Sequence, residues 1–588
     1  MPAADMQTFV AELESRGLLK RIKAEVDPIL EITEITDRVT KAGGPALLFE
    51  NVRGSKIPVL INTFGTKERM CLALGCADFQ ELADRVKMLV KPEVPTTLME
   101  KLKKIPQLMQ LASLPPKIVR RGMCQEVVHT DDADLTTLPA LKCWPGDGDL
   151  SANVYAHVRE IVRQGSGVGV QGSEEGAGRG ARGASAASSS VFVDDTLRRS
   201  LAAMNEGSEH ARELFSIGHN AGGAHANPKS NPGAPGQNPK SLDASRLLPP
   251  GGEGRYLTLT NVFTKNPQTG ERNIGMYRVQ VFGPKLAAMH WHMHHDGARH
   301  YRLHREMGKR MSVAVSFGGP AVMPYAATCP LPPGIDECLF AGFLNGGGIE
   351  LVPCVSQPEI EVPANAEIVV EGYIDPHDDP ILEGPFGDHT GFYSLADLYP
   401  RLHITAITHR KSPIYPTTIV GKPPQEDFWL GKATERIFLP LLKTLIPDIV
   451  DYNLPMFGCF HNCVFVKIKK EYPFQARRVM SAIWGAGQMA FTKMIVVVDE
   501  HVNVHDQDAV LFQMLSNCDP RRDCVITDGP LDILDHASPV CGAGSKIGWD
   551  ATRKLPGEGA VREWPEELEM TPTVREQVTR RWREFGLA

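Results

Sequence analysis

The chain has 588 residues and a formal net charge of −7, from 63 Lys and Arg against 70 Asp and Glu. This acidic balance excludes a nucleic-acid binder that works through overall positive charge. Hydrophobic residues make up 42% and charged residues 23%, an ordinary globular composition that excludes disorder throughout. At about 100 to 200 residues per domain, we expect three domains.

The N-terminal segment does not look like an export signal. It carries Asp5, Glu12 and Glu14 where a signal would have positive charge followed by an apolar run. Apolar runs such as Met494 to Val498 are far shorter than the roughly 20 residues that cross a bilayer. The 12 cysteines are scattered and form no paired CxxC elements, so a disulfide framework is not expected. We therefore expect a cytoplasmic protein.

Residues 1–125 predict an N-terminal α/β domain. The spacing of apolar residues predicts helices over 6–16 and 32–41 and strands over 19–22, 46–49 and 59–61. Helical periodicity returns over 79–111, where Pro92 and Pro95 interrupt it. This part carries no visible chemistry, so we expect it to serve in docking.

Residues 126–400 predict a central domain that contains an insertion at about 164–254. The insertion is rich in Gly, Ala, Ser, Pro and Asn, and such tracts bury too little apolar surface to offset the entropy of ordering. Leu197, Leu201 and Leu214 mark a candidate amphipathic helix, Asp194 to Ile217, within it. We expect a mostly flexible insertion.

After the insertion, short runs alternate apolar and polar residues. Strands are predicted over 256–263, 272–282, 289–294, 311–317 and 367–373, which favours an antiparallel sheet or small barrel. Residues 401–588 predict a second α/β domain, because helices over 432–445, 475–484 and 508–515 alternate with strands over 464–468 and 494–498.

Histidines concentrate in the segment MHWHMHHD. In a strand, His290, His292 and His294 would share one face, where they could bind a metal or a phosphate. A half-buried strand with hydrogen-bonded histidines explains the pattern equally well.

The loop LEGPFGDH places Glu383 and Asp388 five residues apart between glycines and prolines. A rigid loop of this kind can hold a general acid against a substrate, although a solvated turn with capping carboxylates has the same composition. Glu337, in PLPPGIDECLF, is either a first-turn helix acid or a hard oxygen ligand for a divalent cation.

Asn273 and Arg278 also lie five apart, just after a predicted hairpin turn. An odd separation puts them on opposite faces of a regular strand, so a shared site requires a bend or bulge beside Gly275. Arg278 could hold a substrate carboxylate bidentately, or it is a surface arginine. Lys467 could reach an anion or lie at a solvated strand end.

Several long motifs together resemble the UbiD-like decarboxylases. They are WPGDG at 144–148, GRYLTLTNVFTKNPQTGERNIGMYRVQ, MHWHMHHDGARH, LPPGIDECLFAGFL, LEGPFGDHTGFYS and GSKIGWDATRK. They occur in the family's order and span nearly the whole chain outside the insertion. The chain looks most like the quinone-pathway branch, the 3-polyprenyl-4-hydroxybenzoate carboxy-lyases and menaquinone biosynthesis decarboxylases.

The resemblance implies an α+β multidomain fold, with an N-terminal α/β domain, a split β-barrel similar to flavin reductases and a C-terminal α/β domain used in oligomerisation. It implies prenylated FMN as cofactor, bound with Mn²⁺ or another divalent metal and in some relatives with K⁺. It further implies a UbiX-type flavin prenyltransferase as cofactor supplier and a homo-oligomer, dimer or hexamer. No nucleic-acid partner is expected, and membrane contact is at most peripheral.

Residue by residue, the resemblance assigns three groups of sites. Asn273, His294 and Glu337 match the metal ligands. The positions that match cofactor contacts are Met276, Tyr277, Arg278, His290, Trp291, His292, His295, Asp296 and Lys467. The match is weakest for His295 and Asp296, where quinone-branch relatives often have Arg-Gly, and it is loose for Lys467.

Arg278, Glu383 and Asp388 match the family's catalytic Arg/Glu/acid set, with Asp in the third place as in the quinone-pathway enzymes. Arg278 would orient the substrate acid and keep Glu383 ionised, while Asp388 or Glu383 would deliver the proton that replaces carbon dioxide. The two acids are coupled, so either one remains a candidate donor.

The first hypothesis is thus a non-oxidative decarboxylase of a 4-hydroxybenzoate-type or naphthoate-type precursor of ubiquinone or menaquinone. Two alternatives remain: the same scaffold acting on another aromatic or α,β-unsaturated acid, and a flavin- or metal-binding module without turnover. The insertion departs from relatives that run almost directly from WPGDG to GGRY. We expect it to loop outward, with a lid or partner-binding role left open.

Overall fold

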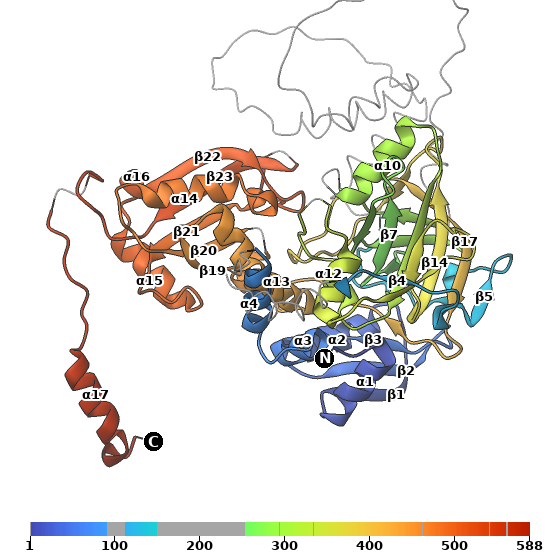
Figure 1. Cartoon of the computed structure of the whole chain (residues 1–588), viewed down its shortest axis with the longest axis horizontal. Helices are drawn as coiled ribbons and strands as arrows, with labels where there is room; N and C mark the ends of the chain where they lie inside the picture. The colour runs from blue at the N-terminus through green and yellow to red at the C-terminus, as the bar shows by residue number, and fades with distance from the viewer. Residues whose placement is uncertain are drawn as a thin grey trace, which may run out of the picture.

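The computed structural model describes residues 2–90, 112–149, 253–292, 295–332, 334–460, 462–539, 541–559 and 562–587. Figure 1 shows three parts: an N-terminal α/β part, a central β part and a C-terminal α/β part that carries a protruding helix. In the described ranges, no helix has the length and apolar character needed to span a bilayer. The predicted insertion helix at 194–217 lies outside these ranges.

The N-terminal part confirms the elements predicted up to residue 61 and the start of the helical stretch at Phe79, whose part beyond Val90 lies outside the described residues. Its sheet has the order β1-β2-β3-β18, with β1 and β2 parallel and the last strand contributed from far along the chain. The Asp5 carboxylate accepts the backbone N–H of Thr8 and so caps the first helix, whose apolar face is buried. The elements are α1 (Met6–Ser15), β1 (Leu19–Val26), α2 (Glu31–Lys41), β2 (Ala46–Val52), β3 (Val59–Ile61), α3 (Lys67–Leu74), α4 (Phe79–Val90) and β18 (Tyr415–Pro416).

The central part is a curled antiparallel sheet, as the alternating pattern predicts. Its order is β6-β9-β10-β17-β14-β11-β7-β8, with β5 paired to β17. The strands are β5 (Val127–His129), β6 (Tyr256–Leu257), β7 (Asn261–Lys265), β8 (Arg272–Gly275), β9 (Val279–Gly283), β10 (Leu286–Met289), β11 (Met311–Gly318), β14 (Ala366–Ile374) and β17 (Arg401–His409).

Smaller elements surround this sheet. Two short sheets have the orders β13-β12-β4 and β15-β16, and helices cover the flanks. They are β4 (Lys117–Ile118), η1 (Met123–Gln125), η2 (Leu135–Thr137), α10 (Asp296–Glu306), α11 (Met323–Ala326), α12 (Glu337–Asn345), β12 (Glu350–Pro353), β13 (Glu361–Pro363), β15 (Ile381–Glu383) and β16 (Asp397–Tyr399).

Three predicted strands are shorter or broken. The run 256–263 is interrupted where Leu259 takes a positive φ of 54°, and the run 272–282 breaks between Gly275 and Val279. The strand predicted over 289–294 ends at Met289, so the inference that His290 and His292 share a strand face is wrong. The break between Gly275 and Val279 lies where a shared site of Asn273 and Arg278 would require a bend.

Described residues on the two sides of the insertion contact each other. A Cβ added to Gly148 would lie 2.6 Å from the Cα of Gly254, and one added to Gly254 would lie 1.9 Å from the carbonyl oxygen of Asp147. Leu141 also forms a bridge with Tyr256 on the other side of the gap. Because these residues before and after the insertion are in direct contact, the sheet forms without a connecting segment of any length between them.

The C-terminal part is the expected second α/β unit. Its sheet has the order β19-β20-β21-β23-β22, in which the middle three strands are parallel. Its elements are α13 (Glu426–Leu445), β19 (Ile449–Asn453), η4 (Met456–Gly458), β20 (Cys463–Ile468), α14 (Gln475–Trp484), η5 (Gly487–Phe491), β21 (Met494–Asp499), α15 (Gln507–Asn517), α16 (Pro520–Asp523), β22 (Cys524–Pro530), β23 (Ala543–Asp550), α17 (Pro572–Arg581) and η6 (Trp582–Phe585).

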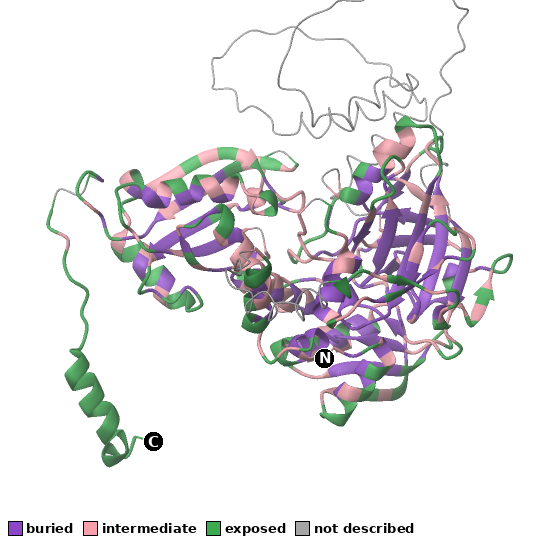
Figure 2. Cartoon of the chain, viewed as in Figure 1, coloured by how far each residue is buried: buried purple, intermediate pink, exposed green. Residues whose placement is uncertain are grey.

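The central sheet extends past residue 400, where the sequence placed a domain boundary. β17 pairs with β10 and β14, and the following residues return to the N-terminal sheet before α13 starts. The boundary therefore moves to the start of α13, because β17 is needed to complete the central sheet. Figure 2 shows that α17 stands clear of the body and is exposed on all sides.

Candidate active site

A buried guanidinium joins the two predicted acids. Arg278 donates from Nε to Glu383 Oε1 over 2.8 Å, and from Nη1 to Asp388 Oδ2 over 2.6 Å. Its Nη2 donates to Glu383 Oε2 over 3.2 Å and to Ser394 Oγ over 3.0 Å. The Phe386 ring lies 4.6 Å from the guanidinium carbon, so one face of the cation is covered. The structure thus brings the predicted catalytic residues into one cluster.

Local backbone breaks place these three side chains. Arg278 lies in the gap between β8 and β9, Glu383 ends β15, and Asp388 follows in the loop. The loop is fixed from outside, because the N–H of Gly387 donates to Asp147 Oδ1 over 2.7 Å. Asp147, in the WPGDG motif, also accepts the N–H of Trp144 over 2.8 Å. The two motifs therefore form one rigid unit.

The charges of the cluster lower the pKa values of both acids. Burial acts to raise the pKa of Glu383, but the charge of Arg278 and hydrogen bonds from Arg278 and His290 outweigh it and lower the pKa to about 2. For Asp388, burial is likewise outweighed by a hydrogen bond from His389 and by Arg278, and the pKa falls well below its usual range. Both acids are ionised in this arrangement at neutral pH.

His290 and His292 reach the cluster although neither lies on a strand. His290 Nδ1 is 2.9 Å from Glu383 Oε2, and its Nε2 is 2.7 Å from Nε2 of His292. Burial and the charge of Arg278 lower the pKa of His290, and burial with the neighbouring His290 lowers that of His292 further. A neutral His290 that donates to Glu383 accepts from His292, which orders both rings.

Aromatic rings form a wall beside this chain of histidines. His295 stacks on His292 with ring centroids 4.8 Å apart, and Tyr277 lies 5.0 Å from His295 and 6.2 Å from Trp291. Trp291 is 5% exposed, and its Nε1 lacks a hydrogen-bond partner among the described residues. Of the other predicted cofactor contacts, Met276 packs partly buried at the edge of the core, and Asp296 begins α10 and pairs with Arg299.

Two of the predicted metal ligands lie on elements that contact each other. Asn273 is on β8 and Glu337 begins α12, and the N–H of Ile274 donates to Glu337 Oε2 over 3.0 Å. Burial raises the pKa of Glu337 to about 7. The buried Nδ2 of Asn273 has no partner in the described part of the chain. The third predicted ligand, His294, lies outside the described residues.

Lys467 is placed apart from this cluster. It lies on β20, opposite Asp451 of β19, in the C-terminal sheet. Among the described residues, no hydrogen bond or ion pair joins it to Arg278, Glu383 or Asp388. Its assignment to the cofactor stays a prediction from resemblance.

Sequence reasoning gave no role to three residues around the acids. His389 ends the LEGPFGDH motif, and its Nδ1 lies 3.1 Å from Asp388 Oδ1. Ser394 accepts from Arg278, and Asp427 lies in the first turn of α13. Adjacency to Asp388 could have indicated His389, whereas Asp427 looks like any acid in the first turn of a helix.

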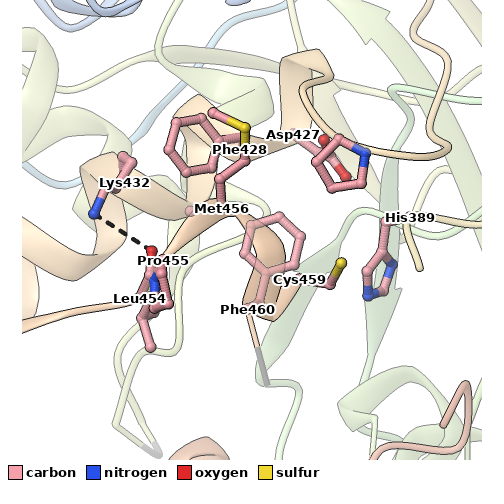
Figure 3. A pocket seen from close by; sticks show the side chains of 11 residues that line it. His389, Asp427, Phe428, Lys432, Leu454, Pro455, Met456, Cys459 and Phe460 are labelled. Carbon is pink, nitrogen blue, oxygen red and sulfur yellow. Dashed lines mark hydrogen bonds between the residues drawn. The ribbon is translucent and has the colours of Figure 1, made fainter. Parts of the chain in front are cut away.

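A small, partly open pocket adjoins the acids on the side of α13, and His389 forms part of its lining. Figure 3 shows His389 on one side of it, Asp427 above and the Phe460 ring beside His389. The remaining lining comes from α13 and from the turn after β19: Pro423, Phe428, Gly431, Lys432, Leu454, Pro455, Met456 and Cys459. The pocket thus lies between the central and C-terminal parts and reaches the catalytic cluster through His389.

Comparisons with solved structures support the fold. Vanillic acid decarboxylase of Sedimentibacter hydroxybenzoicus in its closed form has a TM-score of 0.70 at 22% identity, covering 99% of this chain and 98% of that one. HmfF of Pelotomaculum thermopropionicum, a UbiD-class enzyme solved with FMN, has a TM-score of 0.64 at 22% identity over 97% and 98% of the two chains.

Sequence comparisons give relatives of higher identity than these solved structures. An uncharacterised protein of Aquifex aeolicus is 41% identical over 99% of both chains, and one of Archaeoglobus fulgidus is 39% identical over 100% of this chain and 99% of the other. Three family models of 3-octaprenyl-4-hydroxybenzoate carboxy-lyase match this chain: the N-terminal domain model at residues 10–89, the Rift-related domain model at 247–423 and the C-terminal domain model at 428–551. The chain therefore belongs to the UbiD family of carboxy-lyases.

Proposed function

We propose that this chain is a non-oxidative decarboxylase of an aromatic acid, a 4-hydroxybenzoate-type or naphthoate-type precursor of ubiquinone or menaquinone, and that it works with prenylated FMN. The observation that carries the proposal is the buried cluster of Arg278 with Glu383 and Asp388. A guanidinium of this kind can bind an incoming carboxylate, and two adjacent acids can provide a proton at the same place.

The residues beside the cluster fit the cofactor. Buried polar atoms in native proteins are nearly always paired, so the unpartnered Nε1 of Trp291 and Nδ2 of Asn273 fit a bound group that accepts hydrogen bonds. Tyr277 and His295 would add aromatic contacts to it. When bound, prenylated FMN supplies the electron sink for decarboxylation.

The donors at Asn273 and Glu337 fit a divalent metal such as Mn²⁺. An amide and a buried carboxylate are hard oxygen ligands, which magnesium, calcium and manganese prefer. His294 would complete the set predicted from resemblance, and K⁺ is a further candidate ion. A cation there would also balance the charge of a flavin phosphate.

The residues of this chain have separate roles in the reaction. Arg278 binds the substrate carboxylate and loosens its hold on the acids. Glu383, held by His290, remains the better-fixed carboxylate, and Asp388 is the more accessible donor, with side chains 0% and 11% exposed respectively. The two acids titrate as a coupled pair, and the proton they supply replaces carbon dioxide on the substrate carbon.

A second candidate is the same reaction on another aromatic acid. The structural relatives include vanillic acid decarboxylase and the 3,4-dihydroxybenzoic acid decarboxylase of Klebsiella pneumoniae. The Phe386 ring 4.6 Å from the guanidinium carbon of Arg278 places an aromatic surface beside the group that would bind the acid. We propose a UbiX-type flavin prenyltransferase as cofactor supplier and a homo-oligomeric, cytoplasmic enzyme.

The deciding experiment is co-expression without oxygen with a UbiX-type flavin prenyltransferase. Mass and absorbance spectra of the extracted cofactor, with metal analysis, are expected to give prenylated FMN and one Mn²⁺ per chain. Carbon dioxide release from 4-hydroxybenzoate, 1,4-dihydroxy-2-naphthoate, vanillate and 3,4-dihydroxybenzoate then separates the candidate substrates. Folded protein without flavin would contradict the proposal and favour a module without turnover.

A further inference from the structure

His389 lies between the buried acid and the pocket. Its backbone N–H and its ring Nδ1 both bind Asp388 Oδ1, at 2.8 and 3.1 Å. The ring also lines the pocket, where it meets Phe460 in an edge-to-face contact with centroids 5.3 Å apart. The side chain of Asp388 is 11% exposed and that of His389 is 18% exposed. His389 is therefore in contact with both Asp388 and the pocket that opens to solvent.

We infer that His389 supplies protons from the pocket to Asp388. The inference rests on the proposed decarboxylation with Asp388 as donor, and it goes beyond it by naming the route by which Asp388 regains its proton. Decarboxylation consumes one proton per turnover, and neither acid carries a proton in this arrangement, because both are ionised. A resupply route is thus a chemical requirement.

The surroundings keep His389 charged. Desolvation acts to lower the pKa of His389, but the hydrogen bond and charge of Asp388, with the charges of Asp427 and Asp532, raise it to about 9. The charge of His389 in turn helps to lower the pKa of His292, and Lys432 faces the same pocket from α13. An imidazolium next to the acid is therefore a stored proton at neutral pH.

Substrate binding provides the reason for transfer. Arg278 neutralises Asp388 in the present arrangement, which keeps the proton on His389. A substrate carboxylate that takes N–H groups of Arg278 weakens this neutralisation and adds a negative charge nearby, and both effects raise the pKa of Asp388. The proton of the Asp388 and His389 pair then moves toward Asp388.

Asp388 gives its proton to the carbon that loses carbon dioxide, and this carbon keeps the electron pair of the broken carbon–carbon bond. The Nδ1–H of His389 passes to Asp388, which leaves a neutral ring with its proton on Nε2. A half-turn of the ring presents the vacated nitrogen to the pocket, where water returns one proton from solvent.

The test compares His389→Asn with the wild type in the cofactor-loaded enzyme, using 4-hydroxybenzoate and the other three acids named above. We expect kcat to fall about 100-fold, the low end of what a positioned acid contributes, with KM within about twofold. Added imidazole should restore part of kcat, and the loss of wild-type kcat above pH about 9 should disappear in the variant. A merely structural role would give neither the rescue nor the change in pH profile.

His129→Asn is the matched control, because His129 Nδ1 also binds an aspartate, Asp132, at 2.8 Å on the exposed surface. It should leave kcat unchanged. An active wild type with an equally active His389→Asn would overturn the relay. A wild type that releases no carbon dioxide from any of the acids would count against the proposed function instead.

An activity-independent measurement uses full-length protein with ¹⁵N-labelled histidine. The His389 signal, assigned by its loss in His389→Asn, should show a charged ring at pH 7.5, and Asp388→Asn should lower its pKa. A neutral His389 at pH 7.5 in the wild type would refute the inference without reference to turnover.

Discussion

Replacing Glu383 by Gln tests the electrostatics of the cluster most directly, because Gln keeps the shape and removes the charge. The pKa of Glu383 is lowered from 4.5 to about 2, and its side chain is fully buried. Each pKa unit corresponds to about 1.4 kcal/mol, so the ionised carboxylate stabilises the folded loop by about 3 kcal/mol at pH 7. Glu383→Gln should remove this contribution.

Hydrogen–deuterium exchange of peptides over residues 381–396 measures the local effect. A loss of about 3 kcal/mol predicts protection about 100-fold lower than in the wild type at pH 7, after correction for intrinsic exchange. The folded pKa lies below the ordinary value, so the stabilisation is complete well above pH 4.5 and is lost as the pH falls toward 2. About 1 kcal/mol of this stabilisation should be lost by pH 4. The ratio of wild-type to variant protection should therefore be about fourfold smaller at pH 4 than at pH 7.

The control is Glu25→Gln, which breaks an exposed ion pair with Arg53 at 2.9 Å. Exposed pairs contribute about 0.2 to 1 kcal/mol, so protection near Glu25 should change only a few-fold. Equal protection of Glu383→Gln and wild type at pH 7, or a gap that widens on acidification, would refute the reasoning.

Three further predictions concern the site. Asp388→Asn should reduce kcat at least 100-fold while the extracted cofactor content stays within about 20% of wild type, because a neutral amide cannot deliver the proton; unchanged carbon dioxide release would exclude Asp388 as donor. Gly387→Ala should abolish most activity, since the added Cβ would lie 2.1 Å from Trp144 Cδ1, whereas Gly283→Ala, with nothing within 4 Å, should be silent in the same assay. Glu337→Gln should lower the bound metal measured by elemental analysis, and metal content equal to wild type would remove Glu337 from the metal site.

The sequence predicts the regular elements well where periodicity is strong. The helix Gln475–Trp484 begins and ends where its apolar spacing indicates, and the strand Met494–Asp499 extends the predicted run by one residue. Burial on both faces makes such strands continuous apolar runs, which a pattern detects. The parallel pairing of β20 and β21 follows from the intervening helix.

Periodicity fails at the functional residues because these residues lie where the regular strands end or break. Alternation along a strand predicts that His290 and His292 continue β10, but the strand ends at Met289 and the two rings meet through contacts with Glu383. Leu259, with positive φ, breaks another predicted strand, and no residue type at that position signals the break. Motif resemblance identified Arg278, Glu383 and Asp388 because it does not depend on regular structure.

The geometry of a regular strand explains why the cluster lies where strands end. A regular strand directs successive side chains to opposite faces, so it cannot aim neighbouring groups at a single point. Arg278 precedes β9, Glu383 ends β15, and Gln280 on β9 accepts the N–H of Gly384 over 2.8 Å, which ties the loop to the sheet. The rigid sheet therefore fixes the ends of three irregular segments, and these ends supply the convergent charges. A proton-transfer site needs that convergence, and His389 extends it outward because the loop turns at Asp388 toward the pocket.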